Sequence, residues 1–115
     1  MATEPEVAME RMTEALSLSE LEVVRRSLQA AVEGSFFPDW EFQTLMGVDR
    51  ETVRAVFAAW PHQTIDHEDF RCAVVSSLNN LLGYPHNNED ELMTYVPEGR
   101  TAIRKALDQL VALGI

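Results

Sequence analysis

The residues best suited to metal binding are His62 and His67, which are followed by Glu68 and Asp69. Imidazole and carboxylate groups are common zinc ligands, but the spacing of these two histidines matches no zinc-binding pattern. The stretch also lies where a loop is expected to lead into a helix, and acidic residues favour the positive end of a helix dipole. We therefore interpret it as a solvated helix start, and we expect neither a metal nor another cofactor.

The sequence contains none of the common patterns for nucleophilic or phosphate chemistry. It has no G-x-S-x-G string and no phosphate-binding glycine loop, and its single cysteine, Cys72, has no histidine at a motif spacing. Cys72 lies in an apolar run, which indicates a buried and unreactive thiol. Acid–base catalysis needs two carboxylates held across a cleft, whereas the acidic residues cluster at expected helix starts. We expect that the chain is not an enzyme.

The chain is strongly acidic, with 9 basic and 19 acidic residues and a net charge of −10. Residues 62–98 contain one basic and seven acidic residues, whereas residues 99–115 contain three basic residues and one acidic residue. A field of negative sign repels nucleic acids and anionic membranes and attracts basic proteins. The alternative is that the acidity only keeps the protein in solution.

The length and composition are typical of one folded domain. The chain has 115 residues, of which 46% are hydrophobic, and this is enough to close one core. We expect a single helical domain over residues 1–115, with a frayed tail at 1–5. No basic N-terminal segment precedes an apolar stretch, and no apolar run approaches the ~20 residues that span a bilayer. These features predict a cytoplasmic protein that does not bind membranes.

Helix start signals recur along the chain, whereas strand signals are almost absent. Three residue pairs have the spacing of a capping box, namely Ser17 with Glu20, Asp66 with Asp69, and Asn88 with Glu91. Glycines after expected helix ends suit left-handed stops, at Gly34 and Gly47.

These signals predict an all-α fold, a single compact bundle of five to six short helices with more than half of the residues helical. The clearest helix signals cover residues 18–33, 38–46, 49–60, 67–82 and 98–113, and weaker ones cover 5–15 and 88–95. Because the segment 67–82 has the widest apolar arc, we expect it to form the central buried helix.

Four aromatic residues gather in one short stretch, at Phe36, Phe37, Trp40 and Phe42. They form either an exposed binding patch or part of the core. We favour packing into the core, because that is the usual place of large aromatic side chains.

The stretch FQTLMGVDRETVRAV, from Phe42 to Val56, resembles a helix-turn-helix. The motif has a glycine at its turn, which is Gly47 here, and apolar residues at fixed offsets that lock the two helices together. Gln43 departs from the pattern, because the family usually has a small residue at that place. The resemblance implies that the second helix would present Arg50 and Arg54 to DNA. Few cations cluster there, so we favour a purely structural helix pair.

Two longer strings, FFPDWEFQTLMGVDRETVRAVFAAWP and LNNLLGYPH, are similar to those of a family of short, uncharacterised bacterial helical proteins. Together they cover about half of the chain. This resemblance implies a helical fold and no particular activity.

The resulting functional prediction is an acidic protein-interaction module, for example an immunity-type inhibitor that occupies the basic active site of a toxin or nuclease. The alternative is a helix-turn-helix transcriptional regulator that binds DNA as a dimer through Arg50 and Arg54; a homodimer is open in either case. The expected partner is a basic protein, with nucleic acid only under the alternative. The residues predicted to bind the partner are Glu68, Asp69, Glu89, Asp90, Glu91, Tyr84 and His86.

Overall fold

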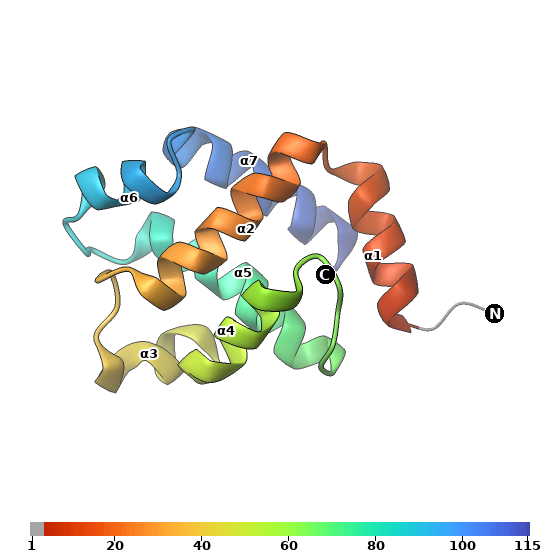
Figure 1. Ribbon diagram of the computed structural model, residues 1–115, viewed down its shortest axis with the longest axis horizontal. Coiled ribbons are helices and arrows are strands. Elements are labelled where there is room, and N and C mark those ends of the chain that lie inside the picture. The colour runs from red at the N-terminus through yellow and green to blue at the C-terminus, as the bar shows by residue number, and fades with distance from the viewer. Residues whose placement is uncertain (1–3) are drawn as a thin grey trace.

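Seven α-helices account for most of the chain in the computed structural model (Figure 1). The structure describes the backbone of residues 4–115 and the side chains of residues 10–115. The helices are α1 (Glu4–Ala15), α2 (Leu18–Glu33), α3 (Asp39–Met46), α4 (Arg50–Ala59), α5 (His67–Gly83), α6 (Glu89–Tyr95) and α7 (Gly99–Leu113). No strand occurs over this range, so the all-α prediction is confirmed. None of the helices described is both long enough and apolar enough to cross a bilayer.

The structure has seven helices rather than the predicted five to six, because the segments with weak signals are helical too. These segments are α1 and α6. The short helices α3 and α4 are two elements, as predicted, and do not merge into one. Gly47, with a left-handed φ of 77°, ends α3, and the Asp49 side chain accepts a hydrogen bond from the backbone N–H of Thr52 to begin α4. The tail expected at residues 1–5 lies in part outside the described residues, and α1 already begins at Glu4.

Two of the three predicted N-caps form. The Ser17 hydroxyl accepts a hydrogen bond from the backbone N–H of Glu20 at 3.1 Å, and the Glu20 carboxylate accepts one from the backbone N–H of Ser17 at 2.9 Å. This is a complete capping box, which satisfies two N–H groups that the helix itself leaves without partners. At the start of α5, the Asp66 carboxylate accepts a hydrogen bond from the backbone N–H of Asp69 at 3.0 Å.

Two other local predictions, those for Asn88 and Gly34, are wrong. The Asn88 side chain does not cap α6 but donates a hydrogen bond to the Ser35 hydroxyl at 3.2 Å, and Glu91 also turns to Ser35. Gly34 is not left-handed; its φ of −77° and ψ of 170° are extended. Glycine is needed there for space, since a Cβ would lie 2.4 Å from the ring of Phe36.

The hydrophobic core is centred on α2 and α5, which cross near the middle of the molecule (Figure 1). Helix α2 packs against α4, α5, α6 and α7, and α5 also packs against α3, α4 and α7. Phe70, Val74, Leu78 and Leu81 of α5 are fully buried. The prediction of a central buried helix at 67–82 is therefore confirmed, and α2 shares the central place.

Cys72 lies half-buried on α5, beside the joint between α3 and α4. A Cβ at Gly47 would lie 3.3 Å from its sulfur. Burial raises the pKa of the Cys72 thiol, and the negative charge of Glu68 adds to this effect. The predicted burial of Cys72 is thus only partial, while its raised pKa keeps the thiol protonated at neutral pH.

Shortening Leu78 to alanine tests the central place of α5. The Leu78 side chain is 0% exposed, so Leu78→Ala is expected to lower the free energy of unfolding by ~2–5 kcal/mol through lost burial and a residual cavity. Leu18→Ala is the matched control, because Leu18 is 86% exposed and its loss should change stability by less than about 0.5 kcal/mol. Urea unfolding followed by circular dichroism measures both. A loss below ~1 kcal/mol for Leu78→Ala would contradict a central α5.

Candidate functional site

A surface groove of about 630 Å³ lies where the end of α2 and the α2–α3 loop meet the segment that follows α5. Its lining includes Tyr84 and His86, two of the residues predicted to bind a partner. The remaining walls come from residues 32–39 together with Arg50 and Pro85. Segments far apart in the sequence thus form one concave surface.

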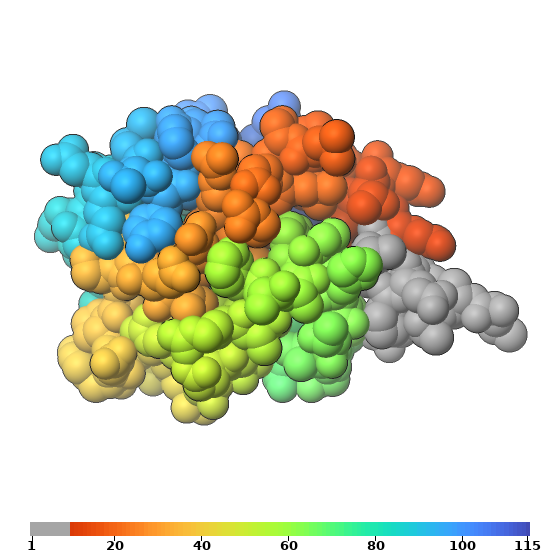
Figure 2. Space-filling view, viewed as in Figure 1, coloured from red at the N-terminus to blue at the C-terminus, as the bar shows by residue number. Residues whose placement is uncertain are grey.

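Hydrogen bonds to Ser35 hold the α2–α3 loop against α6. The Glu91 carboxylate accepts one from the backbone N–H of Ser35 at 3.1 Å and one from its hydroxyl at 2.5 Å. Asn88 donates a third hydrogen bond to the same hydroxyl. The space-filling view shows the gold surface of the loop next to the blue surface of α6 (Figure 2).

Aromatic side chains pack beneath this groove. Phe36 meets His86 edge to face, with 4.9 Å between the ring centroids, and Phe37 meets Tyr84 in the same way at 5.6 Å. Phe36 and Phe37 are buried, and so is Phe42. The prediction that the aromatic cluster packs into the core is confirmed for these three and wrong for Trp40. Trp40 lies on the first turn of α3 and is 79% exposed.

His86 and Tyr84 both have partners within the chain. The backbone N–H of Asn88 donates to Nδ1 of His86 at 3.0 Å, so Nε2 carries the proton of the neutral ring and donates to the carbonyl of Leu81 at 3.1 Å. The Tyr84 hydroxyl donates to the Glu41 carboxylate at 2.7 Å, and this bond raises the pKa of Tyr84. Both residues are thereby held in fixed positions at the groove.

Arg50 joins the groove to the end of α2. Its Nη1 donates to the carbonyls of Ala31 and Val32 at 3.2 and 2.9 Å, and its Nη2 donates to the carbonyl of Phe37 at 3.1 Å and to the Asp39 carboxylate at 2.8 Å. The carbonyls in the last turn of a helix have no partners within the helix and carry partial negative charge. The guanidinium supplies both the missing donors and the compensating positive charge.

The two arginines predicted to contact DNA are therefore used within the fold. The Arg50 side chain is only 22% exposed, and its guanidinium carbon lies 4.2 Å from the centre of the Phe42 ring. Arg54 is paired with Glu51 one turn earlier on α4. The exposed side of α4 thus presents few groups that a phosphate backbone would attract.

The segment of α3 and α4 has the glycine joint and the buried apolar positions of the helix-turn-helix pattern, but α3 packs mainly on α5, and α4 packs on α2 and α5. Gly47 is left-handed at the joint, and Gln43, which departs from the motif, is exposed. The residues at the expected locking positions are all buried, namely Phe42, Met46, Val48, Val53 and Val56. These side chains are thus part of the common core, to which α5 contributes a surface for both helices.

The structure separates the two acidic groups that were predicted to bind one partner. Glu68 and Asp69 lie at the start of α5, whereas Glu89, Asp90 and Glu91 lie at the start of α6, beyond the other end of α5. At 1.5 Å per residue, a helix of 17 residues separates its ends by about 25 Å. Only the second group borders the groove, through the contact of Glu91 with Ser35.

The groove also includes residues that the sequence analysis missed. Glu33 and Asp39 line it, and Glu41 reaches it through Tyr84. No local spacing connects these residues, because they come together only when the α2–α3 loop packs against the segment after α5. The exposed Trp40 beside Asp39 belongs to an aromatic stretch that the sequence did single out.

In the part of the chain that is described, no three or more histidine, cysteine, aspartate or glutamate side chains gather as a group that could hold a metal ion. A comparison with protein-family models, curated proteins and solved structures finds no match to the chain. The two resemblances noted in the sequence therefore remain predictions.

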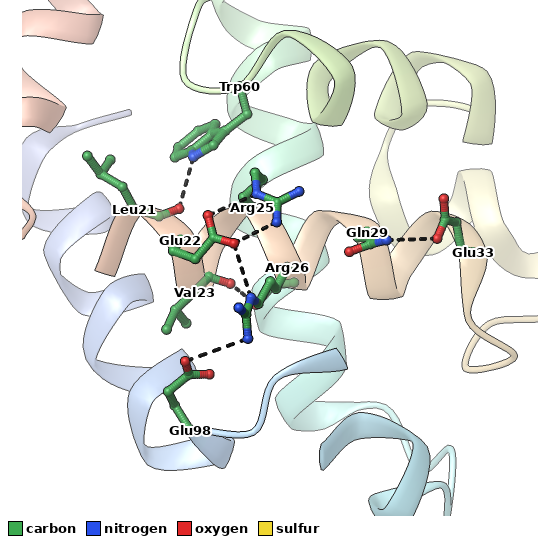
Figure 3. Close-up of polar contacts among 10 residues, drawn as sticks. Leu21, Glu22, Val23, Arg25, Arg26, Gln29, Glu33, Trp60 and Glu98 are labelled. Atoms are coloured by element: carbon green, nitrogen blue, oxygen red, sulfur yellow. Dashed lines mark hydrogen bonds and ion pairs between the residues drawn. The ribbon is translucent and has the colours of Figure 1, made fainter. Parts of the chain in front are cut away.

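Glu22 organises the cations on the outer side of α2 (Figure 3). Its carboxylate accepts hydrogen bonds from Arg25 at 2.6 and 2.9 Å and from Arg26 at 3.1 Å. Arg26 also lies 3.9 Å from Glu98 at the start of α7. The hydrogen bonds from Arg25, with a smaller contribution from Arg26, lower the pKa of Glu22 to about 2.

This shift predicts a pH dependence of stability that Glu22→Gln should remove. A carboxylate whose pKa is lower in the folded state stabilises the fold above its usual pKa of 4.5, and this contribution is lost as the pH falls toward about 2. Because the side chain is 39% exposed, solvent screening limits the contribution to at most about 1 kcal/mol. Urea unfolding at neutral pH should show wild type as the more stable protein, and near pH 2 the two curves should converge. A difference that is the same at both pH values would contradict the ion-pair network.

Replacing each α4 arginine by lysine tests the unequal roles of Arg50 and Arg54. Lysine keeps the charge but lacks the planar group that donates to four acceptors. Arg50→Lys is expected to cost about 1.5–3 kcal/mol of unfolding free energy, since hydrogen bonds to charged groups contribute that much. Arg54→Lys, which alters only a surface pair, should cost less than about 0.5 kcal/mol. Equal unfolding midpoints in urea would show that Arg50 does not hold the α2–α3 loop.

Proposed function

We propose that the protein is an acidic interaction module that acts by binding a basic protein in the cytoplasm, and not by catalysis. One observation carries this proposal, namely that the basic residues are largely used within the fold. Among the described residues, every lysine and arginine except Arg71 and Arg104 makes a hydrogen bond or ion pair with the chain itself. The surface charge that remains for a partner is therefore mostly negative.

Because the cations bond within the chain, acidic side chains without a cationic partner dominate the charge that is left at the surface. Arg100 is bonded to Glu89 and to the carbonyl of Leu82, whereas Glu68 and Asp90 are exposed without a cationic partner among the described residues. Charges of this kind speed the approach of an oppositely charged protein and suppress approach by like charges. An inhibitor that covers the basic active site of a toxin or nuclease is one protein of this class.

A helix-turn-helix regulator is the second proposal, and it is supported by the left-handed Gly47 between α3 and α4 and by the buried apolar residues at the positions of the motif. A DNA reader needs exposed cations on its second helix to neutralise phosphates. Arg50 is held by carbonyls of α2 and by Asp39, and Arg54 is paired with Glu51. For this reason the regulator ranks below the acidic module.

Charge variants that leave the fold intact separate the two proposals. The immobilised chain is used to capture proteins from lysate, the captured protein is purified, and its association rate with each variant is measured. Glu68→Gln combined with Asp90→Asn is expected to slow association with a basic partner by about two- to fivefold at low ionic strength. Arg54→Glu, the control, should leave the rate unchanged or raise it. Arg50 is left intact, because its substitution would disturb the groove.

The opposite pattern would overturn the acidic module. If the chain binds a defined DNA fragment at moderate salt and Arg54→Glu abolishes this binding, the regulator takes its place. If the association rate of the captured partner changes neither with salt concentration nor with the acidic substitutions, attraction by charge is also contradicted.

A further inference from the structure

We infer that the groove is the point at which the partner inserts an arginine-bearing segment. This inference rests on the proposed function and adds to it a place on the surface and the chemistry of the occupant. The groove volume of about 630 Å³ falls within the range of ~300–1,000 Å³ typical of sites that enclose a ligand. Its walls combine aromatic rings with carboxylates.

Three carboxylates around the groove are not neutralised by any cation of the chain. Glu33 accepts a hydrogen bond from the side-chain amide of Gln29, Glu41 accepts one from the hydroxyl of Tyr84, and Glu91 accepts two from Ser35. All of these donors are uncharged. No lysine or arginine among the described residues lies within ion-pair distance of the three carboxylates. Glu33 lines the groove, and Glu41 and Glu91 bond to the lining residues Tyr84 and Ser35, so their negative charge borders the groove without a cation to balance it.

The groove's own cation does not balance them. Both terminal nitrogens of Arg50 are occupied by three carbonyls and the Asp39 carboxylate. The hydrogen bond to Glu41 and the charge of Glu41 raise the pKa of Tyr84. Burial raises the pKa of Tyr95, and the negative charges of Glu33 and Glu91 raise it further. The groove is thus complementary to a cation and unfavourable for a phosphate or another anion.

Trp40 is the exposed aromatic residue that adjoins the groove lining in the sequence. It follows Asp39, which lines the groove, and it is the most exposed aromatic side chain of the described residues. Exposed tryptophans are frequent anchors of protein interfaces, and an indole face attracts a guanidinium. An arginine meets both features at once, because it bonds carboxylates through a planar group that also stacks on aromatic rings, whereas lysine presents only a point charge.

A short capped peptide of sequence Gly-Arg-Gly-Arg-Gly is the probe for this site. Its control is the same peptide with citrulline for arginine, which keeps the shape and removes the charge. The binding is measured by nuclear magnetic resonance on the isotopically labelled full chain at physiological ionic strength. The chain has two tryptophans, and Trp60 is an internal reference because its indole N–H is bonded to the carbonyl of Leu21 (Figure 3).

Addition of the arginine peptide is expected to shift the signals of the Trp40 indole and of residues 33–39 and 84–86, and to leave the Trp60 indole unchanged. The citrulline peptide should cause no such shift. The triple variant Glu33→Gln, Glu41→Gln and Glu91→Gln should bind the arginine peptide more weakly, by about two- to fivefold for each carboxylate removed. Glutamine keeps an acceptor for Tyr84 and Ser35, and the spectrum of the free variant shows whether the fold is kept.

A second triple variant, Glu14→Gln, Glu68→Gln and Asp108→Asn, changes the net charge equally at exposed sites away from the groove. Because charges farther than the ~8 Å screening length act weakly in this buffer, it should bind the peptide like wild type. Equal weakening by both triple variants, or shifts outside the groove, would overturn the groove assignment. If the arginine peptide does not bind at the groove while the chain still captures a basic protein, the inference is wrong and the proposed function stands. If the chain neither binds the peptide nor captures a basic protein, the inference and the proposed function are both wrong.

Discussion

The shape of the groove depends on the hydrogen bonds that the Arg50 guanidinium makes with backbone carbonyls and with Asp39. Arg50 ties the last turn of α2 to the loop before α3 while its own backbone begins α4. Helix ends with unsatisfied carbonyls are costly when they face the protein interior, and a cation from another helix removes that cost. With α2, α3 and α4 fixed in this way, the loop between α2 and α3 can lie against α6 and close one side of the groove.

Local chemistry in the sequence was sufficient for most of the helix boundaries. Ser17, Asp49 and Asp66 start helices because a short polar side chain reaches the free N–H groups of the next turn, and Gly47 ends one because it adopts a left-handed backbone. These effects act within four residues and need no knowledge of the fold. The same reasoning failed at Asn88, where a distant hydroxyl offered a better partner than the local N–H groups.

The candidate site was only partly predictable, for the same physical reason. Tyr84 and His86 were predicted to bind a partner, and they do line the groove. Glu33, Asp39 and Glu41 were not, because their closeness to Tyr84 depends on how α3 packs against α5. The bond between Ser35 and Glu91 joins residues 56 positions apart, and no periodicity or spacing in the sequence encodes such a pair.

The carboxylates around the groove have a consequence for how this protein can change over time. Since Glu33, Glu41 and Glu91 bond only to neutral donors, glutamine can replace each of them without leaving a buried cation alone. Arg50 has no such freedom, because several backbone groups depend on it. Substitutions at these carboxylates can therefore change the charge of the groove, and with it the choice of partner, without changing the fold that Arg50 stabilises.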